Sequence, residues 1–339
     1  MIRVAVVGAG EWGPNLIRNF DDHQQSEVAW VIDGDPLRRE QVAARYPRAL
    51  LDADPRRAFD DPAVDAVVIA TPTVTHFSFA KAALEAGKHV LVEKPATTDY
   101  AHALELCQLA ERNGRVLMVG HVFLYNSSIR YVKEHLESLG RVYYIAMVRT
   151  NLGPIRADVN AAWDLAAHDV SIANYWLEAE PLAASAIGGS WINRGIEDSV
   201  FATLRYADGV LVNLHASWLN PRKARDITVV GDRRMLTFDD MNLGEPIRIY
   251  DKHVDEGRNA SQFIDTFDSF RSGIREGDVT IPKIQSGEPL RRECEHFIDC
   301  VIHGKRPLTD GAEAARVVRV LEAIARSVAN AGREERVAC

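Results

Sequence analysis

Three spaced glycines after an apolar run at the start of the chain constrain the fold more than any other feature. Residues 2–7 read IRVAVV, and Gly8, Gly10 and Gly13 follow at once. After a strand, the first glycine permits a tight turn, the second lets the backbone approach a pyrophosphate, and the third lets the next helix pack closely on the strand. The N–H groups at that helix N-terminus then face the phosphates. The stretch therefore predicts a dinucleotide-binding unit.

Asp33 indicates which dinucleotide binds. It ends the next apolar run, 28–33, about 20 residues after the glycines, where a carboxylate accepts hydrogen bonds from the adenosine ribose and repels a 2′-phosphate. We therefore expect NAD. Arg38 and Arg39 follow closely, and because their charges would neutralise a phosphate, NADP remains the alternative. A turn or helix-capping role is the other interpretation of Asp33.

The first 120 residues alternate short apolar runs with helix-period stretches. Further strand candidates lie at 66–70, 88–92 and 116–119. The amphipathic stretch 99–113 has Asp99 placed to cap a helix and Gly114 placed to end it. Strands separated by helices imply right-handed crossovers and a parallel sheet covered on both faces. We expect an α/β protein with a doubly wound Rossmann domain over residues 1–120.

The rhythm changes after about residue 120, because strand-like runs then follow one another directly. They lie at 141–150, 182–191, 199–206, 210–218, 226–230 and 247–250, and helical stretches lie at 161–178, 288–303 and 311–329. This pattern predicts a largely antiparallel, open sheet with one face for helices and one for a partner. We expect a substrate-binding and oligomerisation domain over 121–339, with C-terminal helices that are able to pack back on the first domain.

Composition excludes several other classes of protein. The 339 residues are 47% hydrophobic and 26% charged, and the formal net charge of -8 argues against nucleic acid or an anionic membrane as the main partner. No apolar run is long enough to span a bilayer, and the N-terminus lacks the pattern of a signal peptide. We expect a cytoplasmic protein. Its cysteines lack metal-ligand spacing and are expected to be packing or surface thiols: Cys107, Cys294, Cys300 and Cys339.

Two strand ends look unlike ordinary turns. They read ATPTVTH over residues 70–76 and VEKP over 92–95. Ligands of parallel sheets bind outside the carboxyl ends of the strands. Lys94 is therefore either a lysine that extends from the surface into solvent or an ammonium that stabilises a developing alkoxide beside a nicotinamide.

Several motifs in order resemble the Gfo/Idh/MocA family of sugar and cyclitol oxidoreductases. They are GAGEWG, ATPTVTH, VEKP, WDLAAHD and GKRPLTDG, and the resemblance extends over essentially the whole chain. It implies that Lys94 contacts both the nicotinamide ribose and the substrate hydroxyl, that its bond to Pro95 is cis, and that the open sheet joins subunits into a homodimer or homotetramer. Further candidates to line the cofactor are Glu11, Trp12, Thr71, Pro72, His76, Glu93 and His121.

Asp164 and His168 stand four apart in the helical stretch 160–177, and hence on one face of a regular helix. Taken alone they are an ordinary polar pair on a solvated face. The family resemblance implies instead that His168 removes the hydroxyl proton and that Asp164 orients it or holds substrate. A metal at His168 and Asp169 lacks a third ligand, so no metal is expected.

Other polar residues on the substrate side are weaker candidates. Arginines there are suited to bind phosphate or carboxylate, and charges at a strand edge facing solvent are the equal alternative. The candidates to hold substrate are Tyr125, Asn126, Arg149, Asn151, Arg156 and Trp163. The stretch 217–225 offers Trp218, Arg222 and Lys223, with a surface hairpin as the alternative.

The resemblance points most closely to enzymes that oxidise the C3 hydroxyl of a nucleotide sugar or an aminoglycoside-type sugar. Such a reaction supplies a keto-sugar to an aminotransferase, as in antibiotic biosynthesis. A myo-inositol or free-sugar dehydrogenase is the second hypothesis, and it needs no site for a distal phosphate. The two hypotheses divide on whether the 149–156 segment faces the substrate. A non-catalytic NAD-binding regulator, or a lyase or hydrolase variant that keeps its cofactor, is the third.

Overall fold

A computed structural model describes residues 1–254 and 274–337. Over these residues the chain divides into two compact units, and each unit is made of two separate stretches of the chain instead of one stretch on either side of residue 120. The first unit joins Met1–Tyr125 to Glu288–Glu322, and the second joins Asn126–Gly287 to Ala323–Cys339. The segment 288–322 belongs to the first unit, in line with the expectation that C-terminal helices are able to pack back on the first domain. No helix in the described part of the chain is long and apolar enough to cross a membrane.

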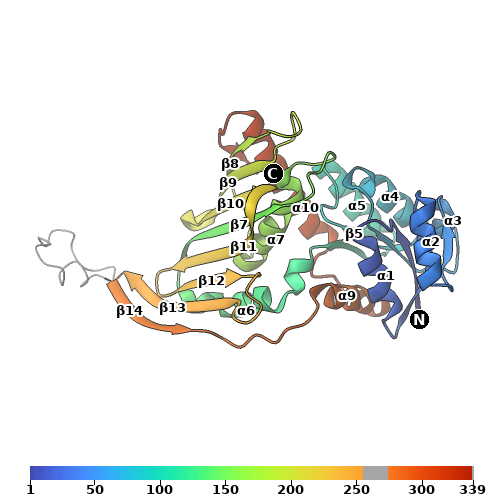
Figure 1. The fold of residues 1–339 in the computed structure, drawn as a ribbon, viewed down its shortest axis with the longest axis horizontal. Coiled ribbons are helices and arrows are strands. Elements are labelled where there is room, and N and C mark those ends of the chain that lie inside the picture. Colours follow the sequence, from blue (N-terminus) through green and yellow to red (C-terminus); the bar gives the residue numbers. More distant parts are fainter. Residues whose placement is uncertain (255–273, 338–339) are drawn as a thin grey trace, which may run out of the picture. The chain divides into compact units, whose positions relative to one another are not determined.

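The first unit contains a parallel sheet with the order β3-β2-β1-β4-β5-β6 (Figure 1). Every neighbouring pair among these strands runs parallel. The strands are β1 (Ile2–Val7), β2 (Ser26–Ile32), β3 (Leu50–Asp52), β4 (Ala66–Ile69), β5 (His89–Glu93) and β6 (Leu117–Gly120). Because the chain extends from β1 in one direction and from β4 in the other, the strand order reverses between β1 and β4, where such sheets bind ligands.

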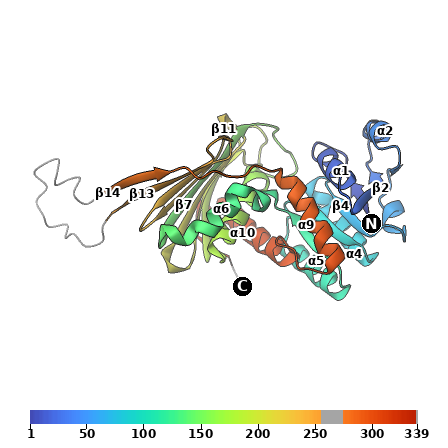
Figure 2. The same cartoon turned by 90° about the horizontal axis from the view of Figure 1, so that it is seen from below.

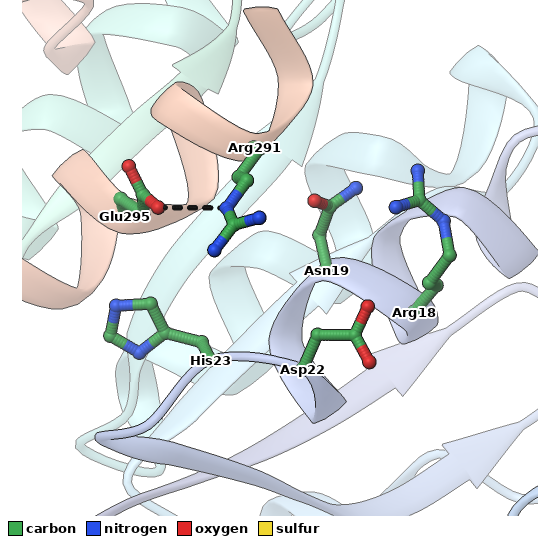
Figure 3. Close-up of a pocket in the computed structure, with 6 residues that line it drawn as sticks. All are labelled: Arg18, Asn19, Asp22, His23, Arg291 and Glu295. Atoms are coloured by element: carbon green, nitrogen blue, oxygen red, sulfur yellow. Dashed lines mark hydrogen bonds and ion pairs between the residues drawn. The ribbon is translucent and has the colours of Figure 1, made fainter. Parts of the chain in front are cut away.

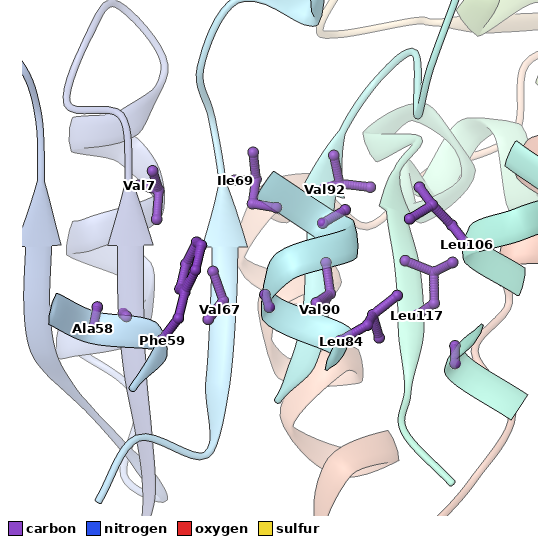
Figure 4. Close-up of a cluster of buried hydrophobic side chains, with 14 of the residues drawn as sticks. Val7, Ala58, Phe59, Val67, Ile69, Leu84, Val90, Val92, Leu106 and Leu117 are labelled. Atoms are coloured by element: carbon purple, nitrogen blue, oxygen red, sulfur yellow. The ribbon is translucent and has the colours of Figure 1, made fainter. Parts of the chain in front are cut away.

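Helices cover both faces of this sheet. The helices of the unit are α1 (Gly13–Asp21), α2 (Pro36–Arg45), α3 (Arg56–Phe59), α4 (His76–Glu85), α5 (Tyr100–Arg112), α9 (Pro289–His303), most of α10 (Gly311–Ala329), and the short η1 (Thr73–Thr75) and η2 (Val122–Tyr125). One apolar cluster joins the sheet to α3, α4 and α5 through Phe59, Leu84 and Leu106 (Figure 4). The other joins it to α1, α2 and α9 through Leu16, Val42 and Phe297.

The second unit is built on a mixed sheet, which over the described residues has the order β14-β13-β12-β11-β7-β10-β9-β8-β15. Its neighbouring strands are antiparallel except for β7 and β10, which run parallel. The strands are β7 (Val142–Leu152), β8 (Ala183–Gly189), β9 (Ser199–Arg205), β10 (Leu211–Ser217), β11 (Leu219–Gly231), β12 (Met235–Asp239), β13 (Ile247–Val254), β14 (Ile274–Thr280) and β15 (Glu335–Arg336).

The two faces of this sheet differ in chemistry. One face buries side chains such as Ile145, Leu204 and Leu214, and the helices of the unit pack there (Figure 2). The indole N–H of Trp176 donates to the Ile129 carbonyl at 2.9 Å and so ties α7 to α6. The helical elements are α6 (Ser127–His135), η3 (Leu136–Leu139), the π-helical turn η4 (Ala162–Ala166), α7 (Ala167–Leu177) and η5 (Ala207–Gly209).

The other face exposes a row of apolar side chains that are neighbours in the strand register. Ile187 pairs with Phe201, Phe201 with His215, and Leu211 with Tyr144. The Phe201 and His215 rings stack with centroids 4.3 Å apart. We call Ile187, Phe201, His215, Leu211 and Tyr144 the open face.

Three expectations from the sequence need correction. The stretch 217–225 is not a surface hairpin: it contains the last residue of β10, Trp218 and the first part of β11, whose register against β7 is irregular between Leu219 and Ala224. Strands β3, β12, β14 and β15 were not predicted from the sequence; β3 and β15 are only three and two residues long, and β14 is polar. The helix expected over 161–178 begins with a π-helical turn, so Asp164 and His168 do not share one regular α-helix.

Candidate functional site

The glycine loop follows β1 at the carboxyl edge of the parallel sheet. Gly8 has φ +99°, and a Cβ there would lie 2.6 Å from the Ala70 carbonyl oxygen. A Cβ on Gly13 would lie 2.1 Å from the Gly8 carbonyl oxygen. Both positions therefore require glycine for steric reasons. Gly10 meets only the Arg38 guanidinium, at 3.4 Å. The loop thus leaves its backbone open at Gly10, with a positive charge beside it.

Asp33 follows β2, and its carboxylate is hydrogen-bonded to the backbone of the glycine loop. One oxygen accepts the Ala9 N–H at 2.7 Å, and the other accepts the Asp35 N–H at 2.8 Å. Arg38 lies 3.7 Å from it, and the Arg39 guanidinium donates to its carbonyl oxygen at 2.5 Å. A carboxylate has about four acceptor positions, so Asp33 retains capacity for ribose hydroxyls.

Lys94 follows the last residue of β5 at the same edge, and its peptide bond to Pro95 is cis. The Glu93 carboxylate accepts the Lys94 N–H at 3.2 Å and a hydrogen bond from the Trp12 side chain. Burial raises the pKa of Glu93 to about 7, against the opposing charge of Lys94. Trp12 stands at the start of α1, so the glycine loop and the end of β5 are directly connected.

Two buried histidines flank Lys94 and differ in their contacts. The ring nitrogens of His76 lie 2.8 Å from the Pro95 carbonyl oxygen and 2.9 Å from that of Thr71, which ties together the ends of β4 and β5. His121 follows β6, is 1% exposed, and neither of its ring nitrogens has a partner among the described residues. Burial and then the charge of Lys94 lower the pKa of His121 to about 3, so its ring is neutral.

The remaining cofactor candidates lie at the same edge. The Thr71 hydroxyl is 2.7 Å from that of Thr75, while Pro72 and Glu11 are exposed. The fold thus gathers the whole predicted cofactor set of residues 8–121 at the carboxyl ends of β1, β2, β4, β5 and β6.

The second unit holds the predicted substrate residues except Tyr125, which belongs to the first. His168 is 9% exposed in the first turn of α7. The Asp164 carboxylate accepts the Trp218 indole N–H at 3.0 Å and an Arg156 N–H at 3.2 Å. Asp164 is therefore fixed by Trp218, which lies between β10 and β11, and by Arg156 in the loop before η4. Trp218, a substrate candidate from the stretch 217–225, is buried, and its indole holds Asp164 in place.

The two candidate arginines are both engaged by carboxylates. Arg149 is buried, and its guanidinium donates twice to one oxygen of the buried Asp169, at 2.7 and 2.9 Å. Burial raises the pKa of Asp169, and the charge of Arg149 opposes that rise. Arg156 forms a two-pronged pair with Asp158 at 2.6 and 2.9 Å. These contacts favour a structural role for Arg149 in particular.

Other predicted substrate residues are placed as follows. Tyr125 is fully buried in the first unit, with its hydroxyl 3.5 Å from that of Thr309, an arrangement that favours packing over substrate contact. Asn126 caps α6 by accepting the Ser128 N–H at 2.8 Å. Asn151 and Trp163 are partly buried, and Arg222 and Lys223 are exposed.

A polar pocket lies between the last turn of α1 and α9 (Figure 3). Its walls are Arg18, Asn19, Asp22, His23, Arg291 and Glu295. The glycine loop stands at the opposite end of α1, and Arg291 and Glu295 are paired at 3.0 Å. This pocket is therefore no part of the dinucleotide site. Within the described ranges, no three His, Cys, Asp or Glu side chains gather as metal ligands.

Sequence reasoning missed one residue of this region. Glu293 on α9 is completely buried, and the carboxylate that acts on it electrostatically is Glu93. The only sequence signal was a charged residue at an apolar position of the helix-period stretch, between Leu290 and Phe297. Such a departure from the helical periodicity of apolar residues indicates that a charged residue is buried, but it does not identify the residues around it.

Comparisons with known proteins show the family of this chain. The model of the GFO/IDH/MocA oxidoreductase family with an NAD-binding Rossmann fold matches residues 2–121, and that of the GFO/IDH/MocA C-terminal domain matches residues 130–237. Together they account for more than half of the chain.

Individual relatives extend over nearly the full length. The UDP-N-acetylglucosamine 3-dehydrogenase of Acidithiobacillus ferrooxidans is 28% identical over 319 residues, 94% of each chain. The NAD-dependent scyllo-inositol 2-dehydrogenase of Bacillus subtilis is 26% identical and covers 92% of this chain and 90% of its own. The structure of GenD2 from gentamicin A biosynthesis, in complex with NAD, has a TM-score of 0.82 at 25% identity, with 100% of this chain and 97% of that one covered.

Proposed function

The chain belongs to the Gfo/Idh/MocA oxidoreductase family, and we propose that it exchanges a hydride between NAD and a secondary alcohol of a sugar, with Lys94 and His168 acting on the same hydroxyl. It is an NAD-binding oxidoreductase that acts on CH–OH groups. The observation that carries the proposal is Lys94 itself, an ammonium at the carboxyl end of β5, joined through Glu93 and Trp12 to the glycine loop.

The residues of the first unit fit a nicotinamide dinucleotide. Gly8 and Gly13 form a turn that no side chain would permit, Asp33 retains acceptor capacity, and His121 presents buried ring nitrogens without a partner among the described residues. The backbone around Gly10 and the start of α1 would hold the pyrophosphate, and Asp33 would hold the adenosine ribose. When bound, the nicotinamide accepts or returns the hydride at C4.

The proposed chemistry divides between two side chains. In the oxidation direction His168 accepts the hydroxyl proton while the carbinol hydrogen leaves as hydride. Lys94 donates a hydrogen bond to the same oxygen and stabilises the negative charge that develops on it. Asp164, held by Arg156 and Trp218, orients the substrate or His168. In the reduction direction the same groups return the proton.

The C3 hydroxyl of a nucleotide-linked hexose or an aminoglycoside-type sugar is the substrate we favour. The full-length likeness to a UDP-N-acetylglucosamine 3-dehydrogenase and to GenD2 supports it. A 3-keto sugar is a substrate for an aminotransferase, so we expect functional coupling to one.

An inositol or free sugar is the second candidate, and one observation favours it. Arg149 and Arg156, the residues expected to bind a distal phosphate, are both paired with carboxylates of the same unit. The likeness to a scyllo-inositol 2-dehydrogenase points in the same direction.

A substrate screen tests the proposal. UDP-hexoses, aminoglycoside precursors, inositols and free sugars should be incubated with NAD, with an aminotransferase present to remove keto product, and NADH formation measured. We expect turnover with one of these classes. Absence of NADH formation with every class, from protein that binds NAD, would contradict the function.

Asp33→Asn should weaken NAD binding about tenfold and change NADP binding by less. The amide keeps one acceptor oxygen but loses the negative charge, which both holds the ribose hydroxyls and repels a 2′-phosphate. Dissociation constants for both dinucleotides, measured by titration calorimetry, give the ratio. Asp35→Asn, at the N-terminus of α2, is the matched control. An unchanged NAD/NADP ratio in Asp33→Asn would remove Asp33 from the ribose site.

We further propose that the open face joins two copies of the chain in a dimer or tetramer. Its large side chains are well exposed, with Ile187 at 60% and Phe201 at 47%, and contiguous apolar patches of this kind mark interfaces. Phe201→Glu should shift the protein to monomers in light scattering after size exclusion. Leu243→Glu, an exposed leucine away from this face, is the control. Wild-type mass in Phe201→Glu would contradict the interface.

A further inference from the structure

The loop between β8 and β9, residues 190–198, lies at the edge of the sheet where Asp164 is held. The strand register pairs the last residue of β8 with the first of β9, and that residue with the last of β10, so these three strand ends share one edge (Figure 1). Trp218, whose indole N–H donates to Asp164 at 3.0 Å, follows β10 directly. Glu197 and Asp198, the last two residues of the loop, have no part in the proposed mechanism.

Glu197 binds the chain just before the π-helical turn that carries Asp164. Its carboxylate accepts the side-chain N–H of Asn160 at 2.6 Å, and its carbonyl oxygen accepts the Ala161 N–H at 2.9 Å. The Asn160 side-chain oxygen accepts the Trp163 N–H at 3.1 Å, and the Asn160 carbonyl oxygen accepts the Asp164 N–H at 3.0 Å. Asn160 thus joins Glu197 to the backbone of Asp164.

The Glu197 carboxylate also decides which way the Asn160 amide points. A side-chain amide has a donor side and an acceptor side, whereas a carboxylate only accepts. The NH₂ of Asn160 therefore faces Glu197, and its oxygen is left for the Trp163 N–H. The strand β8 leaves room for this contact, because a Cβ on Gly188 would lie 2.8 Å from Glu197 Cγ. Loss of the carboxylate would remove the restraint on the turn that ends in Asp164.

Asp198 fixes the residue that meets Asp164 from the other side. The Asp198 carbonyl oxygen accepts the backbone N–H of Trp218 at 2.9 Å. Its carboxylate, 0% exposed, accepts the N–H groups of Trp191 and Ile192 at 2.5 and 2.9 Å and so closes the loop on itself. The end of the loop therefore fixes both the turn below Asp164 and the indole that binds its carboxylate.

We propose that Glu197 is a positioning residue, which sets the place of the Asp164 carboxylate through Asn160, while Asp198 fixes the Trp218 indole against it. The assignment rests on the proposed function for the role of Asp164 in catalysis. The hydrogen-bond path itself lies wholly within the second unit. A displacement of about 1 Å in a group that orients substrate can cost on the order of 10²-fold in rate, so a residue outside the site can control it.

The indole N–H of Trp218 reports the place of Asp164 without substrate. Its ¹H–¹⁵N NMR signal is the one missing in Trp218→Phe, and Asp164→Asn should shift it because the acceptor loses its charge. Glu197→Ala should shift the same signal and speed its exchange with solvent about tenfold, the factor expected for loss of one hydrogen bond to a charged group. Glu197→Gln keeps an acceptor oxygen for Asn160 and should restore most of the wild-type signal.

A second indole separates positioning from a general loosening of the second unit. The Trp176 N–H donates to the Ile129 carbonyl oxygen at 2.9 Å, and its signal should stay in place in Glu197→Ala. Glu245→Ala is the matched control variant, since it removes an exposed carboxylate that accepts the Arg248 guanidinium at 3.0 Å. Neither indole signal should move in Glu245→Ala. An unmoved Trp218 signal in folded Glu197→Ala, or equal shifts of both indoles, would overturn the proposal.

Turnover tests the consequence for catalysis. With the alcohol that the NAD screen identifies, Glu197→Ala should lower kcat/KM about 10- to 100-fold, leave the NAD dissociation constant unchanged, and be largely rescued in Glu197→Gln. Wild-type kcat/KM in a variant whose Trp218 signal has moved would overturn the positioning role. If no alcohol reacts while the Trp218 signal moves as expected, the proposed function is contradicted and the path from Glu197 to Asp164 is supported.

Discussion

Lys94→Ala should lower kcat about 10²–10³-fold with the alcohol that the NAD screen identifies. Loss of a preorganised donor to the developing oxyanion removes about 3–4 kcal/mol of transition-state stabilisation. NAD binding should weaken far less, because the glycine loop, Asp33 and the helix N-terminus hold the dinucleotide independently of Lys94. Steady-state NADH formation and calorimetric NAD titration measure the two effects separately.

Two lysines of the first unit provide controls for this experiment. Lys81→Ala removes an exposed ammonium that pairs with Glu105 at 2.7 Å, and it should leave kcat unchanged. Lys88 donates to the carbonyl oxygens of Asp61 and Val64 at 2.7 and 2.8 Å, so Lys88→Ala should lower the melting temperature instead of the turnover per folded molecule. Near-native turnover in Lys94→Ala would show that its catalytic role is misassigned.

His168→Ala should lower kcat about 10²–10⁴-fold, the range expected when a general base is removed. The loss should be smaller at high pH, where hydroxide in solution takes over part of the proton transfer. Added imidazole should restore part of the activity, because a free base can occupy the space that the side chain leaves. A pH–rate profile with and without imidazole measures both effects.

The control for His168→Ala is His135→Ala. His135 is exposed at the end of α6. Its Nδ1 lies 2.8 Å from the Tyr131 carbonyl oxygen, and its ring stacks on the Tyr131 ring. Its replacement should leave the pH–rate profile unchanged. If His168→Ala keeps the wild-type profile, another group serves as the base.

Local sequence patterns determined most of the parallel sheet within residues 1–120, but neither β3 nor the inclusion of residues 288–322 in the first unit. The glycines after β1, Asp33 after β2 and the Asp99 cap that begins α5 are each specified by residues within a few positions of one another. Strands that are buried on both faces of a sheet read as continuous apolar runs, and these predict parallel strands whose carboxyl ends meet at one edge. The placement of Lys94 at that edge therefore followed from the sequence.

Only the tertiary structure decided which polar groups are paired. Arg149 meets Asp169 from another element, and Trp218 meets Asp164 across 54 positions. The sequence shows a charge in each place but not its partner, because periodicity reports burial within one element and says nothing of what lies opposite. Desolvation makes an isolated buried charge costly, so the distant residues that the fold places beside it determine whether it stays charged or becomes neutral.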